Sequence, residues 1–424
     1  MKRLILLLTI FLALGIVNAQ ETYRFSTDAP QGLSVTSSTA SHVSLHYSIQ
    51  ELVIANVDNE EAKGQEIILK GQFAPNAEGH PNLPVVNRFV AVPQGATVSV
   101  QFRENASTTL NDIDLLPAMP ARTDLAEGPI QLRWDANVFG RDADFPTENI
   151  VLASPTQIRS LDVVLLSVTP FRYNPVRKTL EVIYDIDIDI SFEGGNGQFG
   201  ESRYFNPDWM HILKNLVINN DMLSATDYYD LINAVRDDDE AGCEYLIITP
   251  NNDDALAWAD TLKAFRTKQG ILTKVVTTTE CGGNSANTIR NYILDAYNNW
   301  AIPPAAVLLF GAWYNNTGIR PFYHHTIQGD YNVQYYATDY PYCDMNGDSL
   351  ADVALGRITA RNAQEYQTFV EKTIQYESNP ITDPAYYDRP IISSGHEMNK
   401  WFMIDSQSIN GFYRDKLGKH PTDL

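Results

Sequence analysis

Cysteine is scarce in this chain of 424 residues, which contains three of them. Cys243, Cys281 and Cys343 are too few and too scattered for a disulfide framework, so at most one bridge can form. No two of them form a C-x-x-C pair, which leaves a zinc or redox site with little support. The number and spacing of the cysteines therefore exclude a small fold that depends on several disulfides.

Basic residues are also in the minority, with 31 Lys and Arg against 52 Asp and Glu and a formal net charge of -21. This charge disfavours nucleic acid and anionic membranes as partners, and it suits a soluble exported protein in cation-rich surroundings. The alternative is that the acidity only keeps the protein in solution. The length exceeds what one hydrophobic core usually serves, so we expect two domains.

Long apolar runs are absent after the first twenty residues. Lys2 and Arg3 precede an apolar run over 4–17, and Val17-Asn18-Ala19 places small residues at the usual cleavage positions of a signal peptide. The run is shorter than the roughly 20 residues that a membrane span needs. We therefore expect a secretory signal peptide at 1–19 and no membrane span once it has been removed.

From 20 to 205 the pattern predicts a β-rich domain. Short strands at 42–49, 65–69, 88–92 and 97–102 are separated by Gly, Pro and Asn, which is typical of a sandwich or barrel-like fold. We expect strands 160–168 and 179–192 to form the clearest pair. In the second, Asp185, Asp187 and Asp189 alternate with isoleucines, so one face is acidic. That face either holds a cation or, as we expect, is solvated and discourages edge-to-edge pairing.

Residues 206–242 combine a helical pattern with an acidic, Gly-containing linker that begins at Arg236. Such a linker is exposed, so cleavage after Arg236 is one hypothesis and an ordinary charged linker is the other. From 243 to 424 the period changes to β-α-β-α-β, with strands at 244–249, 272–277 and 305–310 and helices at 253–269 and 286–300. This order predicts a parallel, doubly wound sheet. We expect it to continue through strand 352–355, helix 362–378, strand 389–393 and a helix over 401–417.

Ligands of open α/β sheets lie beyond the carboxyl ends of the strands, so the following loops are where chemistry is expected. Cys281 lies between a strand and a helix, where its pKa could be lowered, but a plain turn at Gly282 and Gly283 explains the sequence equally well. His396 and the pair His324-His325 are more typical of surface or loop histidines than of metal ligands. Neither the G-x-S-x-G motif of serine hydrolases nor a Gly-rich phosphate loop is present.

The stretch 342–357 contains the most specific motif. Asp344, Asn346, Asp348 and Asp352 stand at relative positions 1, 3, 5 and 9, with Gly347 at the bend. This is the oxygen-ligand spacing of a calcium loop, and hard oxygen ligands favour Ca²⁺. Leu355 stands where an EF-hand has its Glu, so a helix-loop-helix hand is not expected. The alternative is an Asx-rich turn without metal.

Motifs in both halves of the chain resemble those of one family. In the first half they are GHPNLPVV at 79–86, VAVPQGA at 90–96 and PFRYNP at 170–175. In the second half they are YLIITP at 245–250, VLLFG at 307–311, DMNGD at 344–348, LGRI at 355–358 and TIQYE at 373–377. Their order resembles the propeptide and the front of the catalytic domain of gingipain-like cysteine peptidases, peptidase family C25.

The resemblance implies a secreted bacterial endopeptidase, made as a zymogen, that acts on protein or peptide substrates. Its fold would be an all-β prodomain followed by a caspase-like α/β doubly wound domain, and its own propeptide would be its intramolecular inhibitor. The family's Cys-His dyad includes a Gly-His-Gly motif, which this sequence lacks, and both catalytic residues would follow Leu424.

No catalytic residue is therefore carried over, and we expect a C-terminally truncated peptidase domain that is inactive alone. Ala312 also stands where many relatives place an Asp. The alternative is a non-catalytic exported binding or surface protein that keeps the fold without the dyad.

Overall fold

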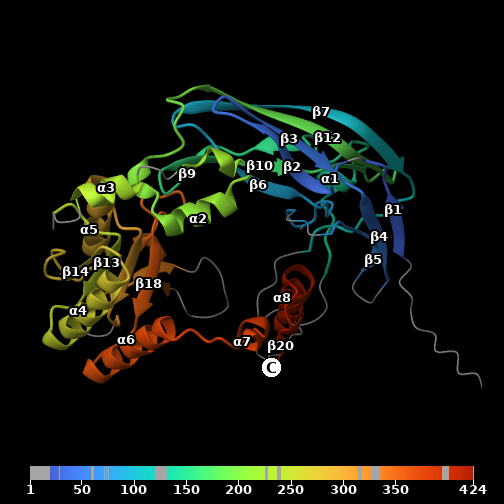
Figure 1. The fold of residues 1–424 in the computed structure, drawn as a ribbon. Coiled ribbons are helices and arrows are strands. Elements are labelled where there is room, and N and C mark those ends of the chain that lie inside the picture. The colour runs from blue at the N-terminus through green and yellow to red at the C-terminus, as the bar shows by residue number, and fades with distance from the viewer. Residues whose placement is uncertain are drawn as a thin grey trace, which may run out of the picture.

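A computed structural model describes residues 20–27, 29–58, 62–70, 72, 74, 76–119, 131–224, 228–235, 240–313, 318–325, 335–393 and 401–423. They form an N-terminal β domain and a C-terminal α/β domain (Figure 1). The predicted fold class, an all-β domain followed by a doubly wound α/β domain, is confirmed. The expected signal peptide, Arg236 and His396 lie outside the described residues. No helix in the described ranges is long and apolar enough to cross a membrane.

The described residues of the β domain form three antiparallel sheets. The first has five strands: β11 (Phe171–Asn174), β12 (Thr179–Gly194), β3 (His42–Ser48) and β2 (Gly32–Ser38) in spatial order, with β7 (Ala96–Leu110) pairing along the other side of β12. The second joins β6 (Val86–Ala91), β10 (Leu161–Val168) and β8 (Ile150–Leu152), and β9 (Thr156–Ile158) also pairs with β10. The third contains β1 (Gln20–Arg24), β4 (Glu51–Asp58) and β5 (Lys63–Ile68). A short helix, α1 (Ala136–Phe139), follows later in the chain.

The inner faces of these sheets share one hydrophobic core. Ile186, Ile188 and Ile190 of β12 are buried in it, together with residues of β3, β6 and β10. The aspartates between them point to the opposite face, because successive side chains of a strand alternate. The predicted two-sided character of this strand is confirmed.

One pairing that we predicted is wrong. Strand β10 and strand β12 lie in different sheets and do not pair, and β10 instead pairs with β6, β8 and β9. The reason lies in the connection between them, which is not a simple loop. Its residues 171–174 form β11, which turns back on β12 with Phe171 opposite Val182 and Asn174 opposite Thr179. Because β11 takes this edge of β12, β10 packs across the core instead.

A short helical segment connects the two domains. It contains η1 (Ser202–Tyr204), α2 (Pro207–Leu216), η2 (Asn220–Met222) and α3 (Tyr228–Val235). Helix α2 begins where the Asn206 side chain accepts a hydrogen bond from the Trp209 N–H, with Pro207 in the first turn. Figure 1 shows α2 between the strands β6, β9 and β10 and the sheet of the α/β domain.

The α/β domain is built on a four-stranded parallel sheet in the order β14 (Thr273–Thr277), β13 (Tyr245–Thr249), β15 (Ala306–Phe310), β18 (Ala354–Ile358). Helices α4 (Asp253–Lys268) and α6 (Ala363–Ser378) share a core with one face, and α5 (Ala286–Asn299) shares a core with the other. Ser285 caps α5 as predicted, by accepting from the Thr288 N–H. A hairpin of β16 (Phe322–His325) and β17 (Tyr335–Thr338) and the turn η3 (Tyr340–Tyr342) lie between β15 and β18.

The prediction that strand 389–393 continues this sheet is also wrong. Strand β19 (Ile391–Ile392) pairs in parallel with β20 (Thr422–Asp423), and these two strands form a sheet of their own. After α6 the chain passes through Pro380 and the short helix α7 (Pro384–Asp388), which separate β19 from the sheet. Figure 1 shows α7 and α8 (Trp401–Leu417) apart from the four-stranded sheet.

Candidate functional site

The carboxyl ends of the parallel strands form one edge of the sheet, where open α/β folds bind ligands. A cavity of about 310 Å³ lies there, lined by Ala312, Trp313, Thr359 and Arg361. The first two residues follow β15 and the other two follow β18, so the cavity joins the ends of neighbouring strands. Trp313 is largely exposed, which places an aromatic surface at the cavity mouth. The loop after Phe310 is one of those where we expected a ligand from the sequence, and this stays a prediction.

Arg357 of β18 holds the loops around this edge. Its guanidinium pairs with both carboxylate oxygens of Asp339, at 2.6 and 2.7 Å. The same group donates to the carbonyls of Gly311 and Ile319 at 2.9 and 3.0 Å. A planar guanidinium suits such a set of fixed acceptors better than an ammonium does. Arg357 therefore ties the loop after β15 to the segment that precedes η3.

Gly311 is required at the turn after β15. A Cβ atom there would lie 2.9 Å from Cγ of Pro250, which follows the neighbouring strand β13. The two loops can approach closely only because residue 311 has no side chain. Ala312, which follows, is buried and donates its N–H to the carbonyl of Ala360 at 3.0 Å.

The three cysteines do not offer a nucleophile in this structure. Burial raises the pKa of the Cys243 and Cys281 thiols to about 12 and that of Cys343 to about 11. Thiolates are the reactive form, so all three are held in the unreactive state near neutral pH. The Cys343 thiol donates to the Tyr340 carbonyl at 3.0 Å. All three are free of disulfides.

The histidines that the sequence singled out give no catalytic pair either. His324 lies on β16 and stacks on Tyr336, with ring centroids 5.7 Å apart. Across the ranges that the structure describes, no hydrogen bond joins a cysteine to a histidine. His324 is an exposed residue of a hairpin, as the sequence favoured.

The four predicted calcium ligands lie at the opposite, amino-end edge of the sheet, because their loop precedes β18. Asp344 accepts from the N–H groups of Gly347 and Ser349 at 2.6 and 3.2 Å. Asn346 and Asp348 contact each other at 3.1 Å, between the amide nitrogen and a carboxylate oxygen. The structure thus forms a tight loop around backbone donors, with Gly347 in a left-handed conformation.

Two of these aspartates bind the β domain as well as their own loop. Asp348 accepts from the hydroxyl of Thr156 and, at 3.2 Å, from the N–H of Gln157. Asp352 is almost fully buried and accepts from the Arg159 N–H at 2.8 Å and the Met345 N–H at 2.8 Å. Asp348 thus contacts strand β9, and Asp352 contacts the turn that follows it.

Among the described residues, the set of acidic and histidine side chains with ligand atoms within 4.8 Å of one another lies elsewhere, at His46, Asp185 and Asp187. There Asp187 pairs with His46 at 2.9 Å and with Arg103 at 2.6 Å, and Asp185 accepts from Asn105 at 2.9 Å. This acidic face of β12 is already paired with donors of neighbouring strands. Calcium at the Asp344 loop stays a prediction.

Arg159 is the residue at this junction that our interpretation of the sequence missed. It is fully buried, and its side chain donates to the carbonyls of Tyr204, Pro304 and Asp352. The acceptors come from the connecting segment and from the starts of β15 and β18. The sequence shows only an arginine between two short strands, with no local signal for burial.

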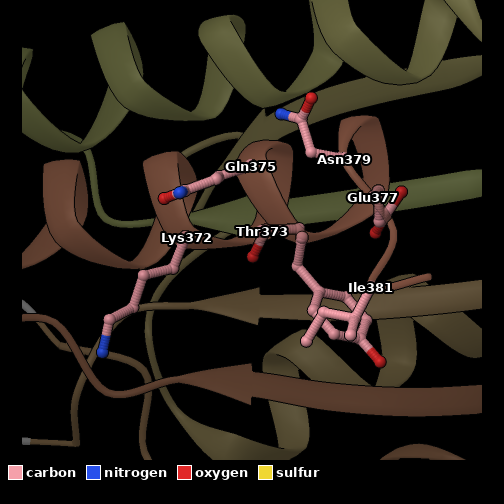
Figure 2. A pocket seen from close by; sticks show the side chains of 7 residues that line it. Lys372, Thr373, Gln375, Glu377, Asn379 and Ile381 are labelled. Atoms are coloured by element: carbon pink, nitrogen blue, oxygen red, sulfur yellow. The ribbon is translucent and has the colours of Figure 1, made fainter. Parts of the chain in front are cut away.

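A second cavity, of about 570 Å³, lies at the end of α6. Figure 2 shows its side chains along the last turns of α6 and on the loop that follows, where Asn379 and Ile381 stand. Glu377 at its margin already pairs with Arg266 of α4. The residues that line this cavity include no cysteine or histidine, so it offers no Cys-His dyad.

The fold and the junction together define a two-part protein, in which a turn of the β domain is docked on the amino-end edge of a parallel α/β domain. The family model described as Propeptide_C25 matches residues 23–202, and the model of Peptidase family C25 matches residues 238–416. The two matches together span most of the chain. The chain belongs to peptidase family C25 and carries that family's propeptide.

The chain is also similar to individual proteins of Porphyromonas gingivalis. A Lys-gingipain is 24% identical over 408 residues, which are 93% of this chain and 22% of the relative. Gingipain R2 is 22% identical over 330 residues, which are 76% of this chain and 41% of the relative. The chain thus spans about a fifth of the Lys-gingipain that it matches.

Two solved structures are similar to parts of the chain. The complex of RgpB pro- and mature domains from P. gingivalis is 23% identical and covers 44% of this chain and 97% of its own, with a TM-score of 0.39. A structure on the zymogenic latency of gingipain K from P. gingivalis is 21% identical and covers 42% of this chain and 100% of its own, with a TM-score of 0.37.

Proposed function

We propose that this chain belongs to a secreted cysteine endopeptidase zymogen, in which the β domain is the propeptide and inhibits the α/β domain in the same chain. The supporting observation is the junction between the two. One hydrophobic core contains Ala91, Ile158 and Leu161 of the β domain together with residues of the connecting segment and the peptidase sheet. A junction of this kind resembles a domain interior more than a transient contact.

The chemistry follows from the family. A histidine would take the proton of the catalytic cysteine, and the thiolate would attack a peptide carbonyl to form an acyl-enzyme that water then hydrolyses. The family resemblance implies a dyad C-terminal to Leu424. Cys243, Cys281 and Cys343 are buried with raised pKa values and are not proposed as the nucleophile. The cavity beside Trp313 and Arg361 would contribute to the substrate side of the sheet.

The alternative is an exported binding or surface protein that keeps the fold without the dyad. The three buried cysteines of this chain do not distinguish the two, because the accessible thiolate of the peptidase is proposed to lie outside it. The gene beyond the codon for Leu424 distinguishes the two. A Gly-His-Gly motif and a downstream cysteine support the enzyme, whereas a stop at that codon supports the binding protein.

The zymogen proposal makes a kinetic claim that can be measured. The longer gene product should hydrolyse peptides slowly while the β domain is attached, and faster after proteolytic removal of that domain. Equal rates before and after removal would contradict the inhibitor role.

Export is tested by sequencing the N-terminus of the protein from the medium, where a start at Gln20 is expected.

A further inference from the structure

The Arg159 side chain occupies a closed recess between the two domains. Its Nε donates to the Tyr204 carbonyl at 2.5 Å, and its Nη1 donates to the carbonyls of Pro304 and Asp352 at 3.0 and 2.9 Å. Within the described ranges, no carboxylate forms an ion pair with this guanidinium. The three neutral carbonyls are thus the hydrogen-bond acceptors of this buried charge. Loss of any one would leave a buried N–H without an acceptor, which costs free energy in an apolar site.

Aromatic rings complete the recess. The guanidinium carbon lies 5.7, 5.1 and 5.8 Å from the ring centroids of Tyr204, Trp209 and Tyr297. Two of the rings are fixed, since Trp209 donates to the Ala305 carbonyl at 2.8 Å and the Tyr204 hydroxyl donates to the Tyr297 carbonyl at 3.1 Å. Ring faces attract cations, most strongly where water is excluded. Burial lowers the pKa of Arg159 to about 10, so the group remains charged at neutral pH.

The peptidase domain supplies its share of the recess from fixed positions. Pro304 and Asp352 precede the neighbouring parallel strands β15 and β18, so their carbonyls emerge at the same edge of the sheet. Tyr297 stands in the last turn of α5, which packs on that face. These groups therefore belong to the α/β domain and not to the β domain.

The turn that presents Arg159 is strained. Arg159 and Ser160 have φ values of 44° and 66°, in the left-handed region that residues other than glycine rarely adopt. Such a conformation persists where surrounding contacts determine it. Here the Asp352 carboxylate accepts the Arg159 N–H at 2.8 Å, and the Ser160 hydroxyl accepts from the Glu201 N–H at 3.2 Å. The contacts of the recess thus hold both the backbone and the guanidinium.

We propose that the amino-end edge of the peptidase sheet carries a guanidinium-binding site, and that its ligand is an arginine presented on a left-handed turn, supplied in this chain by Arg159. The inference rests on the proposed propeptide role of the β domain and names the contact that anchors it. Arginine is required over lysine, because the three carbonyls are reached by two nitrogens of one planar group.

Chemical rescue in the full chain tests this site. Arg159→Ala removes the guanidinium and leaves the recess, so amide exchange at Met345 and at position 159 should accelerate on the order of 10-fold or more. Millimolar ethylguanidine should then restore protection and raise the melting temperature in a saturable way, whereas ethylamine should not. Wild-type chain should respond to neither. Equal effects of the two compounds, or no effect of ethylguanidine, would overturn the proposal.

Arg159→Lys is the second variant, in case Arg159→Ala fails to fold. Arg159→Lys keeps the positive charge and removes the guanidinium. If amide exchange at Met345 in this variant is as slow as in the wild type, no guanidinium is needed, and the proposal is overturned. If Arg159→Ala is insoluble, the yield of soluble chain after refolding with ethylguanidine or ethylamine gives the same comparison. If rescue fails, the guanidinium-binding site is overturned, and the zymogen proposal is still decided by its kinetic test. If the longer product is inactive, the zymogen proposal fails, and the guanidinium-binding site is still decided by the rescue experiment.

Discussion

Arg159 and Asp352 are joined by two hydrogen bonds, one from backbone to side chain and one from side chain to backbone. The Arg159 N–H donates to the Asp352 carboxylate at 2.8 Å, and the Arg159 guanidinium donates to the Asp352 carbonyl at 2.9 Å. The residues are 193 positions apart in the sequence. Both are buried, so this pair connects the β domain to the start of β18 without solvent between them.

Loss of the Asp352 carboxylate should weaken this junction. Asp352→Ala leaves the N–H groups of Arg159 and Met345 buried without acceptors, so we expect a loss of about 2 to 4 kcal/mol in the free energy of unfolding. Asp352→Asn keeps one acceptor oxygen and should lose less. Urea unfolding measures both, with Glu371→Gln on the exposed face of α6 as the control. A loss below about 0.5 kcal/mol, typical of surface changes, would contradict the role of this carboxylate.

Asn219 should be a second anchor between the connecting segment and the β domain. Its fully buried side chain accepts from the Ala91 N–H at 2.8 Å and donates to the Ala91 carbonyl at 2.9 Å, as a neighbouring strand would. Asn219→Ala should cost about 2 to 4 kcal/mol, because both groups of Ala91 lose their partner. Amide exchange at Ala91 should accelerate, whereas Asn220→Ala, one residue away and exposed, should leave it unchanged.

Much of the fold was predictable because its signals are local. The apolar run at 305–310 predicted β15, Ser285 predicted the start of α5, and the alternation along β12 predicted which face is buried. The pairing of β10 with β12 failed because strand partners depend on distant residues, and 171–174 formed a strand of its own. The prediction that β19 continues the parallel sheet was wrong, because a strand of two residues is too short to show a periodic pattern in the sequence.

The candidate site was only partly predictable, because some of its contacts join residues that are distant in the sequence. The motif at 344–352 indicated a tight loop, and the structure has one, in which Asp344 and Asn346 accept from backbone N–H groups. The carboxylates of Asp344, Asp348 and Asp352 are not among the groups of described side chains with ligand atoms within 4.8 Å of one another. Its partners Thr156, Gln157 and Arg159 belong to the other domain, and nothing in their own sequence neighbourhood marks them. Contacts across a domain junction leave no periodic pattern in either segment.

The acidic face of β12 should make stability depend on pH. Hydrogen bonds from His46, Asn105 and Arg103 lower the pKa of Asp187 to about 2 from its usual 3.8. A lowered pKa means that the ionised form stabilises the folded state above about pH 4, and that this contribution is lost as the pH falls toward about 2. The side chain is about a third exposed, so solvent screening keeps the effect small.

The measurement is the difference in melting temperature between wild type and Asp187→Asn as a function of pH. It should shrink as the pH falls from about 4 to about 2, and it should also shrink at high salt. Glu193→Gln, an exposed change on the same strand, controls for the loss of one negative charge. A difference that is constant across this range would show that the ionised Asp187 does not stabilise the fold.

The three cysteines should resist alkylation in the folded chain. With pKa values of about 12, 12 and 11, Cys243, Cys281 and Cys343 have few thiolates at about pH 8, and burial also blocks access. We expect iodoacetamide to react at least on the order of 100-fold more slowly than with the unfolded chain. Mass spectrometry of labelled peptides locates any reaction. Rapid labelling of Cys281 in the folded state would make it a candidate nucleophile again.

Calcium at the Asp344 loop requires a test that separates metal binding from the contacts already present. Ca²⁺ favours the hard oxygens of Asp344, Asn346, Asp348 and Asp352, but in this structure the carboxylates accept from N–H and hydroxyl donors, some of them from the β domain. If the loop binds Ca²⁺, titration should raise the melting temperature of the wild type and not that of the double variant Asp344→Ala, Asp348→Ala. Asp185→Asn serves as the control, because it alters the other acidic cluster and should keep the full response. Identical responses of the wild type and the double variant would remove the metal assignment and leave an Asx-rich turn that holds the propeptide.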